Sequence, residues 1–340
     1  MFNKAISIAL VIGFASTAQA STITDEYTGF YTFGDSLSDD GLFVQLAPPS
    51  VGGRFTNGPT WTEIVAAEFE ANGRDTGSLA LGGATAVDGP NGLDPNLPLT
   101  TFAAQIDAFA ASLMGGFGLP ADVFGSTQPG APTPGSNPLI SVLFGGNDFF
   151  QGYGPVEAAN AVADGIRAIG SITGQSFNDF LVGNLGDIGA TPAFSDPVRS
   201  GLGTDFSGAY NMALGVNMTA LRLEGYNIID FDYAGVNEAI ADDIDNGGTL
   251  YGLLDGETPC AASLTTFDPN SCLFNGPDID TLFFIDGVHP TRIVHEVIGA
   301  AALARIEASI PAPVPLPAGL PLLVMGLGGL TVAARRRKAA

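Results

Sequence analysis

Patterns of buried strands and amphipathic helices alternate along this chain, and this alternation restricts its fold more than any other feature. The run LISVLFGG at 139–146 is apolar throughout, which is typical of a strand buried on both faces. Residues 155–172 instead repeat apolar side chains at spacings of three and four behind Pro155, as an amphipathic helix does. Further strand patterns occur at 29–36, 180–189 and 227–233, and further helical patterns at 61–73, 101–113, 207–225 and 293–309. Strands that alternate with helices predict an α/β fold with a parallel sheet flanked by helices.

The N-terminal segment has the pattern of a secretory signal peptide. Lys4 precedes an apolar run at 5–15, and the small-residue string Ala18-Gln19-Ala20 follows it. The run is too short to span a bilayer, so cleavage after Ala20 is favoured over an N-terminal membrane anchor. Residues 21–310 would then form the folded domain.

The C-terminal segment combines a proline-rich linker at 311–319, an apolar stretch at 320–334 and a basic cluster at 335–338. The apolar stretch lies near the lower limit of about 17 residues for a membrane-spanning helix, and the basic cluster would stay cytoplasmic. The string VPLPA, the apolar stretch and the basic cluster together resemble the PEP-CTERM-like sorting signals of Gram-negative bacterial surface proteins. This resemblance implies that 320–340 contacts the membrane before a sorting protease cuts it. A permanent anchor is the alternative.

Without the two end segments the remaining body is strongly acidic. The chain has 12 basic and 35 acidic residues and a net charge of −23, and five of the basic residues but none of the acidic ones lie in the end segments. The body therefore keeps 7 basic residues and a net charge of −28. Such a surface repels nucleic acids and anionic lipid headgroups, so neither is an expected partner.

The cysteines and the acidic runs do not favour a metal centre. Cys260 and Cys272 are the only cysteines, and an exported protein would pair them in one disulfide, with two free thiols as the alternative. No nearby histidine pair accompanies them, which speaks against a zinc site. The run ADDIDNGG at 241–248 hints at calcium ligation but lacks the glutamate that closes an EF-hand loop. A solvated acidic helix end is the favoured interpretation, so no metal or other cofactor is predicted.

Three residues that are distributed over the chain could carry out nucleophilic acyl transfer. Ser36 follows a strand pattern, which places it at the carboxyl edge of the sheet, where open α/β folds build their sites. A helix starting directly after Ser36 would aim amide groups at the reacting oxygen; alternatively, Ser36 only caps that helix. Asp286 and His289 share the string DGVHP, in which the carboxylate could orient the imidazole towards a serine. His295, the only other histidine, lies inside a predicted helix and is interpreted as structural.

Four short blocks resemble, in order, those of the GDSL/SGNH hydrolases. They are GDSLSD around Ser36, LGGAT around Gly83, GGND ending at Asp148, and DGVHP around His289. The strings RFTNGPTW and NLGDIGATPAF are also similar to the secreted esterase, lecithinase and haemolysin branch of this family. The resemblance covers about residues 29–305. It implies a three-layer α/β/α sandwich with a mostly parallel, flavodoxin-like sheet, and hydrolysis of carboxylic esters without a cofactor.

The resemblance also implies roles for individual residues. Ser36 matches the nucleophile, His289 the base that later protonates the leaving alcohol, and Asp286 the residue that orients the imidazole. The backbone N–H groups of Ser36 and Gly83 and the side-chain amide of Asn147 match the donors of the oxyanion hole. These donors suit that role because they are uncharged and can be preorganised.

The match is incomplete near the second block. Ser78 stands where that block usually begins with asparagine, and Gly82 competes with Gly83 as the backbone donor. Asp35 and Asp39 flank the serine. We expect these two carboxylates to bond turn amides and to have no catalytic role.

Together these features predict an exported serine esterase or lipase that acts on a small-molecule or lipid ester. Export would place it outside a Gram-negative cell or on the cell surface. A periplasmic or membrane-anchored protein is the alternative. An acyltransferase or a polysaccharide deacetylase could use the same residues. A non-catalytic surface adhesin or carbohydrate-binding protein is the alternative of another class. It is disfavoured because a binding module does not need the complete Ser, Asn, Asp and His set.

Overall fold

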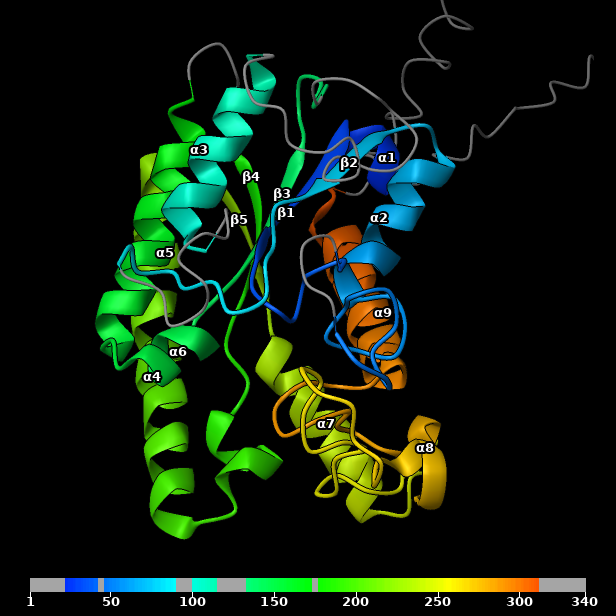
Figure 1. The fold of residues 1–340 in the computed structure, drawn as a ribbon. Coiled ribbons are helices and arrows are strands. Elements are labelled where there is room, and N and C mark those ends of the chain that lie inside the picture. The colour runs from blue at the N-terminus through cyan, green and yellow to red at the C-terminus, as the bar shows by residue number, and fades with distance from the viewer. Residues whose placement is uncertain (1–21, 42–45, 90–99, 115–132, 173–176, 312–340) are drawn as a thin grey trace, which may run out of the picture. The chain divides into compact units, whose positions relative to one another are not determined.

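A sheet of five parallel strands lies at the centre of the computed structural model, which describes residues 22–41, 46–89, 100–114, 133–172 and 177–311 (Figure 1). The strands are β1 (Gly29–Gly34), β2 (Asp75–Ser78), β3 (Leu139–Leu143), β4 (Asp179–Gly183) and β5 (Asn227–Phe231). Their order is β2-β1-β3-β4-β5, and every neighbouring pair is parallel. The predicted parallel sheet is confirmed, and its order is that of flavodoxin-like folds.

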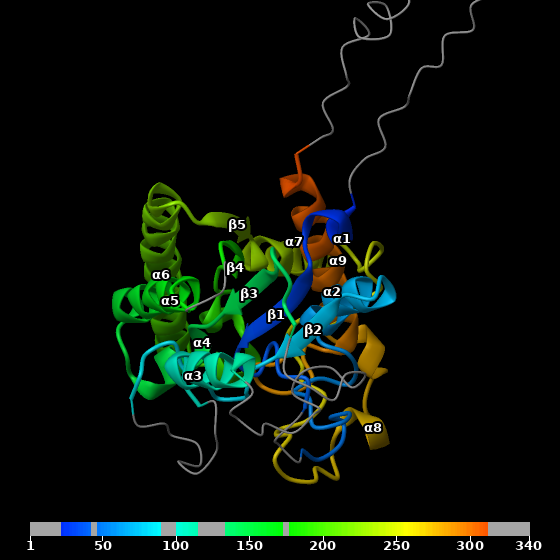
Figure 2. The same cartoon turned by 90° about the horizontal axis from the view of Figure 1, so that it is seen from above.

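Helices cover both faces of this sheet, so the expected three-layer α/β/α sandwich is confirmed (Figure 1). One face carries α3 (Phe102–Leu113), α5 (Pro155–Gly170) and α6 (Pro197–Glu224), and the other carries α2 (Trp61–Ala71) and α9 (Arg292–Ser309). Figure 2 shows the sheet from above, between these two helical layers. The most extensive helix packing joins α5 to α6 and α2 to α9.

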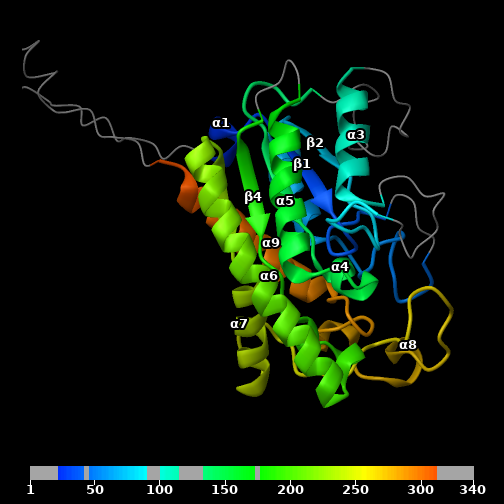
Figure 3. The same ribbon diagram turned by 90° about the vertical axis from the view of Figure 1, so that its left-hand side faces the viewer.

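Three further helices lie beyond the carboxyl ends of the strands. Figure 3 shows α4 (Gly146–Gln151), α7 (Tyr233–Asp245) and α8 (Cys272–Asn275) on that side of the sheet. The remaining elements are α1 (Ile23–Glu26) and the 3₁₀ turns η2 (Ile188–Ala190), η3 (Pro192–Phe194) and η4 (Ile279–Thr281). Because α4, η2 and α7 follow β3, β4 and β5 in the chain, they surround the edge at which the functional residues were predicted.

Capping signals account for the limits of α6, the longest helix described. The apolar periodicity predicts its start near residue 207, but the helix begins at Pro197. Asp196 accepts hydrogen bonds from the first two amides after Pro197, and proline suits the first helical position. Gly225, with φ of +104°, ends the helix in the left-handed conformation.

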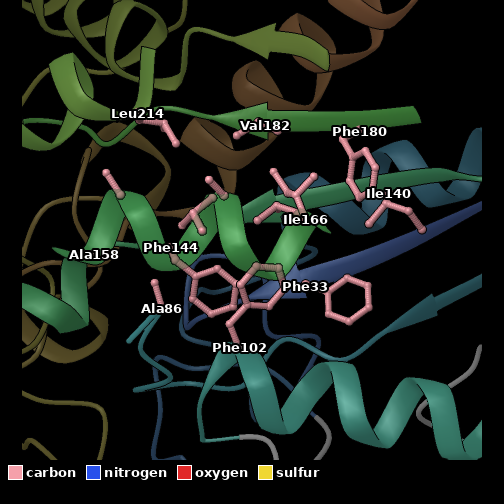
Figure 4. Close-up of a cluster of buried hydrophobic side chains, with 14 of the residues drawn as sticks. Phe33, Ala86, Phe102, Ile140, Phe144, Ala158, Ile166, Phe180, Val182 and Leu214 are labelled. Carbon is pink, nitrogen blue, oxygen red and sulfur yellow. The ribbon is translucent and has the colours of Figure 1, made fainter. Parts of the chain in front are cut away.

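The main apolar core lies between the sheet and the layer of α3, α5 and α6 (Figure 4). Every residue of β1, β3 and β4 is buried. Phe33 and Phe144 both lie against Phe102, with ring centroids 5.8 and 4.7 Å apart. A side chain at Gly165 would collide with the Phe102 ring, so the glycine allows α3 to approach α5. This close packing makes the sheet a rigid support for the residues at its edge.

Residues Ile23–Ser309 form one compact unit. The predicted signal peptide at 1–20, nearly all of the linker and the sorting segment at 320–340 lie outside the described residues. The proposed domain limits (1–20, 21–310, 311–319 and 320–340) therefore stay predictions. Within the described residues, no helix has the length and apolar character needed to cross a membrane.

Candidate active site

Ser36 lies two residues beyond β1, next to the point where the sheet order reverses between β1 and β3. Crevices at such points are the usual sites of open α/β sheets. The predicted helix after Ser36 is absent from the described residues, because Asp35 draws the chain into a tight turn instead. Its carboxylate accepts the amide of Leu37 at 3.1 Å, and its carbonyl accepts the amide of Ser38 at 3.0 Å. Ser36 is therefore not a helix cap.

The structure brings Ser36, His289 and Asp286 into one hydrogen-bonded chain. Ser36 Oγ lies 2.8 Å from His289 Nε2, although the two residues are 253 positions apart. His289 Nδ1 lies 2.8 Å from Asp286 Oδ2 and 2.9 Å from Oδ1. This order of hydroxyl, imidazole and carboxylate is the arrangement that activates a serine for acyl transfer.

The loop that carries Asp286 and His289 is held by its own hydrogen bonds. Asp286 Oδ1 also accepts the backbone amides of Val288 at 2.9 Å and His289 at 2.8 Å, and the amide of Ile285 bonds the carbonyl of His289 at 2.9 Å. Burial opposes ionisation of Asp286, but the adjacent imidazole and these amides hold the pKa of its carboxyl below the usual range. The carboxylate therefore stays charged and fixes the orientation of the imidazole.

The predicted oxyanion donors Gly83 and Asn147 line the same cavity as Ser36. Gly83 has φ of +82°, a conformation that glycine adopts without strain. The amide of its competitor Gly82 donates to Asp39 Oδ2 at 2.7 Å, so that N–H is already engaged. This contact favours Gly83 over Gly82 as the donor.

Buried carboxylates position both donor segments, a function that goes beyond the turn amides expected for Asp35 and Asp39. Burial raises the pKa of the Asp35 carboxyl to about 7, although its interaction with the Asn147 side chain acts in the opposite direction. Asp39 bonds the turn amide of Gly41 at 2.8 Å in addition to the Gly82 amide. Asp148 accepts hydrogen bonds from the backbone amides of Ala86 and Val87, which follow Gly83 in the same loop, at 3.0 Å each.

Phe55 is a site residue that the sequence analysis missed. Its ring centroid lies 4.8 Å from that of His289, and it lines the cavity beside Ser36. A side chain at Gly82 would collide with this ring, so Phe55 packs against both the imidazole and the Gly82 backbone. The string RFTNGPTW contained Phe55, but only the fold shows which residues it contacts.

The other candidates lie away from this constellation. His295 is buried in α9 and its Nδ1 accepts the amide of Trp61 at 3.2 Å, while burial lowers the pKa of its imidazole to about 3. Cys260 and Cys272 form the predicted disulfide. In the acidic run at the end of α7, Asp243 accepts backbone amides of the following turn. The described part of the chain contains no cluster of three or more His, Cys, Asp or Glu residues suited to a metal ion.

Comparison with known proteins gives a family and distant relatives. The model of the family described as GDSL-like lipase/acylhydrolase matches residues 30–302. An uncharacterized protein in the trpE-trpG intergenic region of Pseudomonas putida is 28% identical over 326 residues, which covers 86% of this chain and 50% of that protein. A phosphatidylcholine-sterol acyltransferase of Aeromonas hydrophila is 39% identical over 80 residues, which covers 22% of this chain and 23% of the acyltransferase. The chain thus spans half or less of the length of these relatives.

Solved structures also match this chain at low sequence identity. Est24, a carbohydrate acetylesterase from Sinorhizobium meliloti, is 15% identical with a TM-score of 0.44, and the match covers 83% of this chain and 99% of Est24.

Proposed function

Since this chain belongs to the GDSL-like lipase/acylhydrolase family, we propose that it hydrolyses carboxylic esters through an acyl-enzyme formed on Ser36. The observation that carries the proposal is the 2.8 Å contact between Ser36 Oγ and His289 Nε2, with Asp286 bonded to the opposite ring nitrogen. A neutral imidazole placed in this way can remove the serine proton as the hydroxyl attacks.

In the acylation step, Ser36 Oγ attacks the ester carbonyl while its proton passes to His289 Nε2. The imidazolium that forms is stabilised by the Asp286 carboxylate. The tetrahedral intermediate then collapses, the bond to the alkoxide breaks, and His289 returns the proton to the departing alcohol. In the deacylation step, water loses a proton to His289 as it attacks the acyl-enzyme, and the same proton returns to Ser36 as the carboxylic acid leaves.

The negative oxygen of both tetrahedral intermediates needs preorganised donors. We assign this role to the backbone N–H groups of Ser36 and Gly83 and to the amide of Asn147. The Asp35 carboxyl interacts with the Asn147 side chain and would help to hold its amide in place before substrate binds. Such preorganisation avoids the reorganisation that water would need, and each donor is worth about a hundred- to a thousand-fold in kcat.

Replacement of the nucleophile tests the proposal. Ser36→Ala is expected to abolish turnover of p-nitrophenyl acetate and covalent labelling by a fluorophosphonate, with an unchanged circular dichroism spectrum. Asp286→Asn should keep the fold and lower kcat by about four orders of magnitude, because the imidazole is then held in the wrong tautomer. Retained turnover or retained labelling in the folded Ser36→Ala protein would contradict the acyl-enzyme mechanism.

Acyl transfer to an alcohol is the second candidate, favoured by the largely apolar cavity beside Ser36, which would limit access of water to the acyl-enzyme. The likeness to the Aeromonas hydrophila phosphatidylcholine-sterol acyltransferase points in the same direction. The test adds increasing concentrations of a primary alcohol to the ester assay and quantifies new ester against free acid. A product ratio that stays at free acid throughout would exclude the transferase.

We also propose that the protein is exported across the cytoplasmic membrane of a Gram-negative bacterium. The disulfide between Cys260 and Cys272 supports this proposal, because such bonds persist in oxidising compartments. Mass spectrometry of the protein from its native cells should find a mature chain that begins at Ser21 and, after sorting by a membrane protease, lacks 320–340. A cytoplasmic protein that retains residues 1–20 would contradict export.

A further inference from the structure

One cavity of about 440 Å³ is lined by Ser36, Gly83, Asn147 and His289 and also by residues of α7. The α7 residues are Ala234, Asn237, Glu238 and Ala241, at spacings of three and four that place them on one face of the helix. We call the part of the cavity beside this face the groove. Figure 1 shows α7 running away from the sheet, and the lining residues reach from Ala234 to Ala241 of this helix.

Large apolar side chains from other elements also line the cavity. They include Phe150 of α4, Leu185 after β4 and Ile188 of η2. The two alanines have the smallest side chains among the α7 residues that line the groove, so they take up little of its space. A lining of apolar side chains and small alanines suits a hydrocarbon chain better than a sugar, which needs many hydrogen-bonding partners.

The charge of the groove restricts the ligand further. Glu238 and Asp187 are the charged residues along its described lining beyond the catalytic end. Both acids are exposed, as is Ala241, so these three residues lie at the rim of the groove and Ala241 marks its outer end on α7. Together with the net charge of −28 on the body, they disfavour an anionic chain and allow a neutral one.

We propose that this groove binds the acyl chain of the ester and selects neutral chains, with Ala234 and Ala241 setting the accepted length. This inference rests on the proposed function. From Tyr233 to Ala241 the helix advances about 12 Å at 1.5 Å per residue. An extended carbon chain advances about 1.25 Å per bond, from bond lengths near 1.5 Å and angles near 111°. The groove therefore accommodates about eight to ten carbons.

The test measures kcat/KM for p-nitrophenyl esters from acetate to palmitate, each below its solubility limit. Each buried methylene should raise kcat/KM by up to about four-fold until the groove is filled, after which the rise should stop. The expected optimum lies at the octanoate or decanoate ester. Because p-nitrophenol is the alcohol of every ester in the series, a change of kcat/KM along the series arises from the acyl chain.

Ala241→Phe should fill the outer groove and lower the decanoate-to-butyrate ratio of kcat/KM by at least about ten-fold, the loss expected for two or more methylenes. Ala241→Leu provides a smaller change if the phenylalanine variant fails to fold, and should shift the ratio in the same direction. Ala239→Phe is the matched control, since Ala239 lies on the same helix, is exposed and does not line the cavity. It should leave the ratio within about two-fold.

The outcomes separate this inference from the proposed function. If the wild-type protein hydrolysed none of these esters, the proposed ester hydrolysis itself would be contradicted. Turnover that is equal for all acyl lengths, or that depends on the length of the alcohol and not of the acyl chain, would overturn only the acyl groove. An equal change of the ratio in Ala239→Phe and Ala241→Phe would also overturn it.

Discussion

Replacing Asn147 with alanine separates the chemical role of this side chain from its structural one. Asn147 lies in the first turn of α4, lines the cavity beside Ser36 and interacts with the buried carboxyl of Asp35. Loss of one oxyanion donor is expected to lower kcat by about a hundred- to a thousand-fold, or about 2.7–4 kcal/mol. KM should change by less than about three-fold, because the oxyanion exists only in the transition state and intermediate.

The same substitution should also lower stability. Asp35 would keep the hydrogen bond from the Leu37 amide but lose its interaction with the Asn147 side chain. A buried polar group that loses a partner costs about 1–3 kcal/mol. At about 2–4 °C per kcal/mol for a domain of this size class, Tm should fall by roughly 2–12 °C. Differential scanning calorimetry measures this change, and kinetics with p-nitrophenyl butyrate measures kcat.

Asn217→Ala provides the matched control. Asn217 of α6 is partly buried and donates at 3.0 Å to the carbonyl of Ala159 and to Asn160 Oδ1, away from the cavity. Its removal should lower Tm by a similar amount, because a hydrogen bond of this kind is worth about 1 kcal/mol. It should leave kcat within about two-fold, because Asn217 does not line the cavity. A loss of kcat below ten-fold in Asn147→Ala would refute its role as an oxyanion donor. An equal loss in both variants would assign the effect to stability alone.

Three further changes test other parts of the structure. Phe55→Ala removes the ring that packs on His289, a contact worth about 0.5–1.5 kcal/mol. The value of kcat/KM should therefore fall by about two- to twelve-fold. Phe55→Tyr keeps an aromatic ring and should retain the wild-type kcat/KM. A loss of Tm with unchanged kcat/KM would show that the ring only supports the fold. Burial raises the pKa of Asp40 to about 7, so the folded protein loses stability as pH rises through 7. Asp40→Asn should therefore stabilise the protein by ~1–2 kcal/mol more at pH 8 than at pH 5 in thermal unfolding, after allowance for its partial exposure, and a pH-independent difference would contradict this reading. Replacing Cys260 and Cys272 by serine opens a loop with a sequence separation of 12 and should lower stability by about 3 kcal/mol, as should reduction of the wild-type protein, and an unchanged Tm in both cases would contradict the estimate.

Features that depend on neighbouring residues were predictable. The strand at Leu139–Leu143 and the helix at Pro155–Gly170 follow from apolar periodicity, because burial on two faces or on one face selects the pattern directly. The pairing of Asp286 with His289 is also local, since a turn of three residues brings the carboxylate to the imidazole. The order of four motif blocks then identified the family without any contact being known.

Errors arose where side chains competed with local patterns. The helix expected after Ser36 does not form, because the Asp35 carboxylate captures an amide of the turn. The start of α6 was placed too late, because the Asp196 cap precedes the apolar repeat by several residues. Neither outcome follows from hydrophobic periodicity, since each depends on a single carboxylate that accepts hydrogen bonds from backbone amides.

The sequence by itself determined the class of fold, the residues able to act as nucleophile and base, and the acidic, lysine-free surface of the body, since these depend on residue type and short spacings. Only the tertiary structure decided that Ser36 Oγ and His289 Nε2 lie 2.8 Å apart, that Phe55 packs on the imidazole, and that one face of α7 lines the groove. The physical reason is that contacts between distant segments are set by the packing of whole helices on the sheet. No local pattern records which face of a helix will meet which loop.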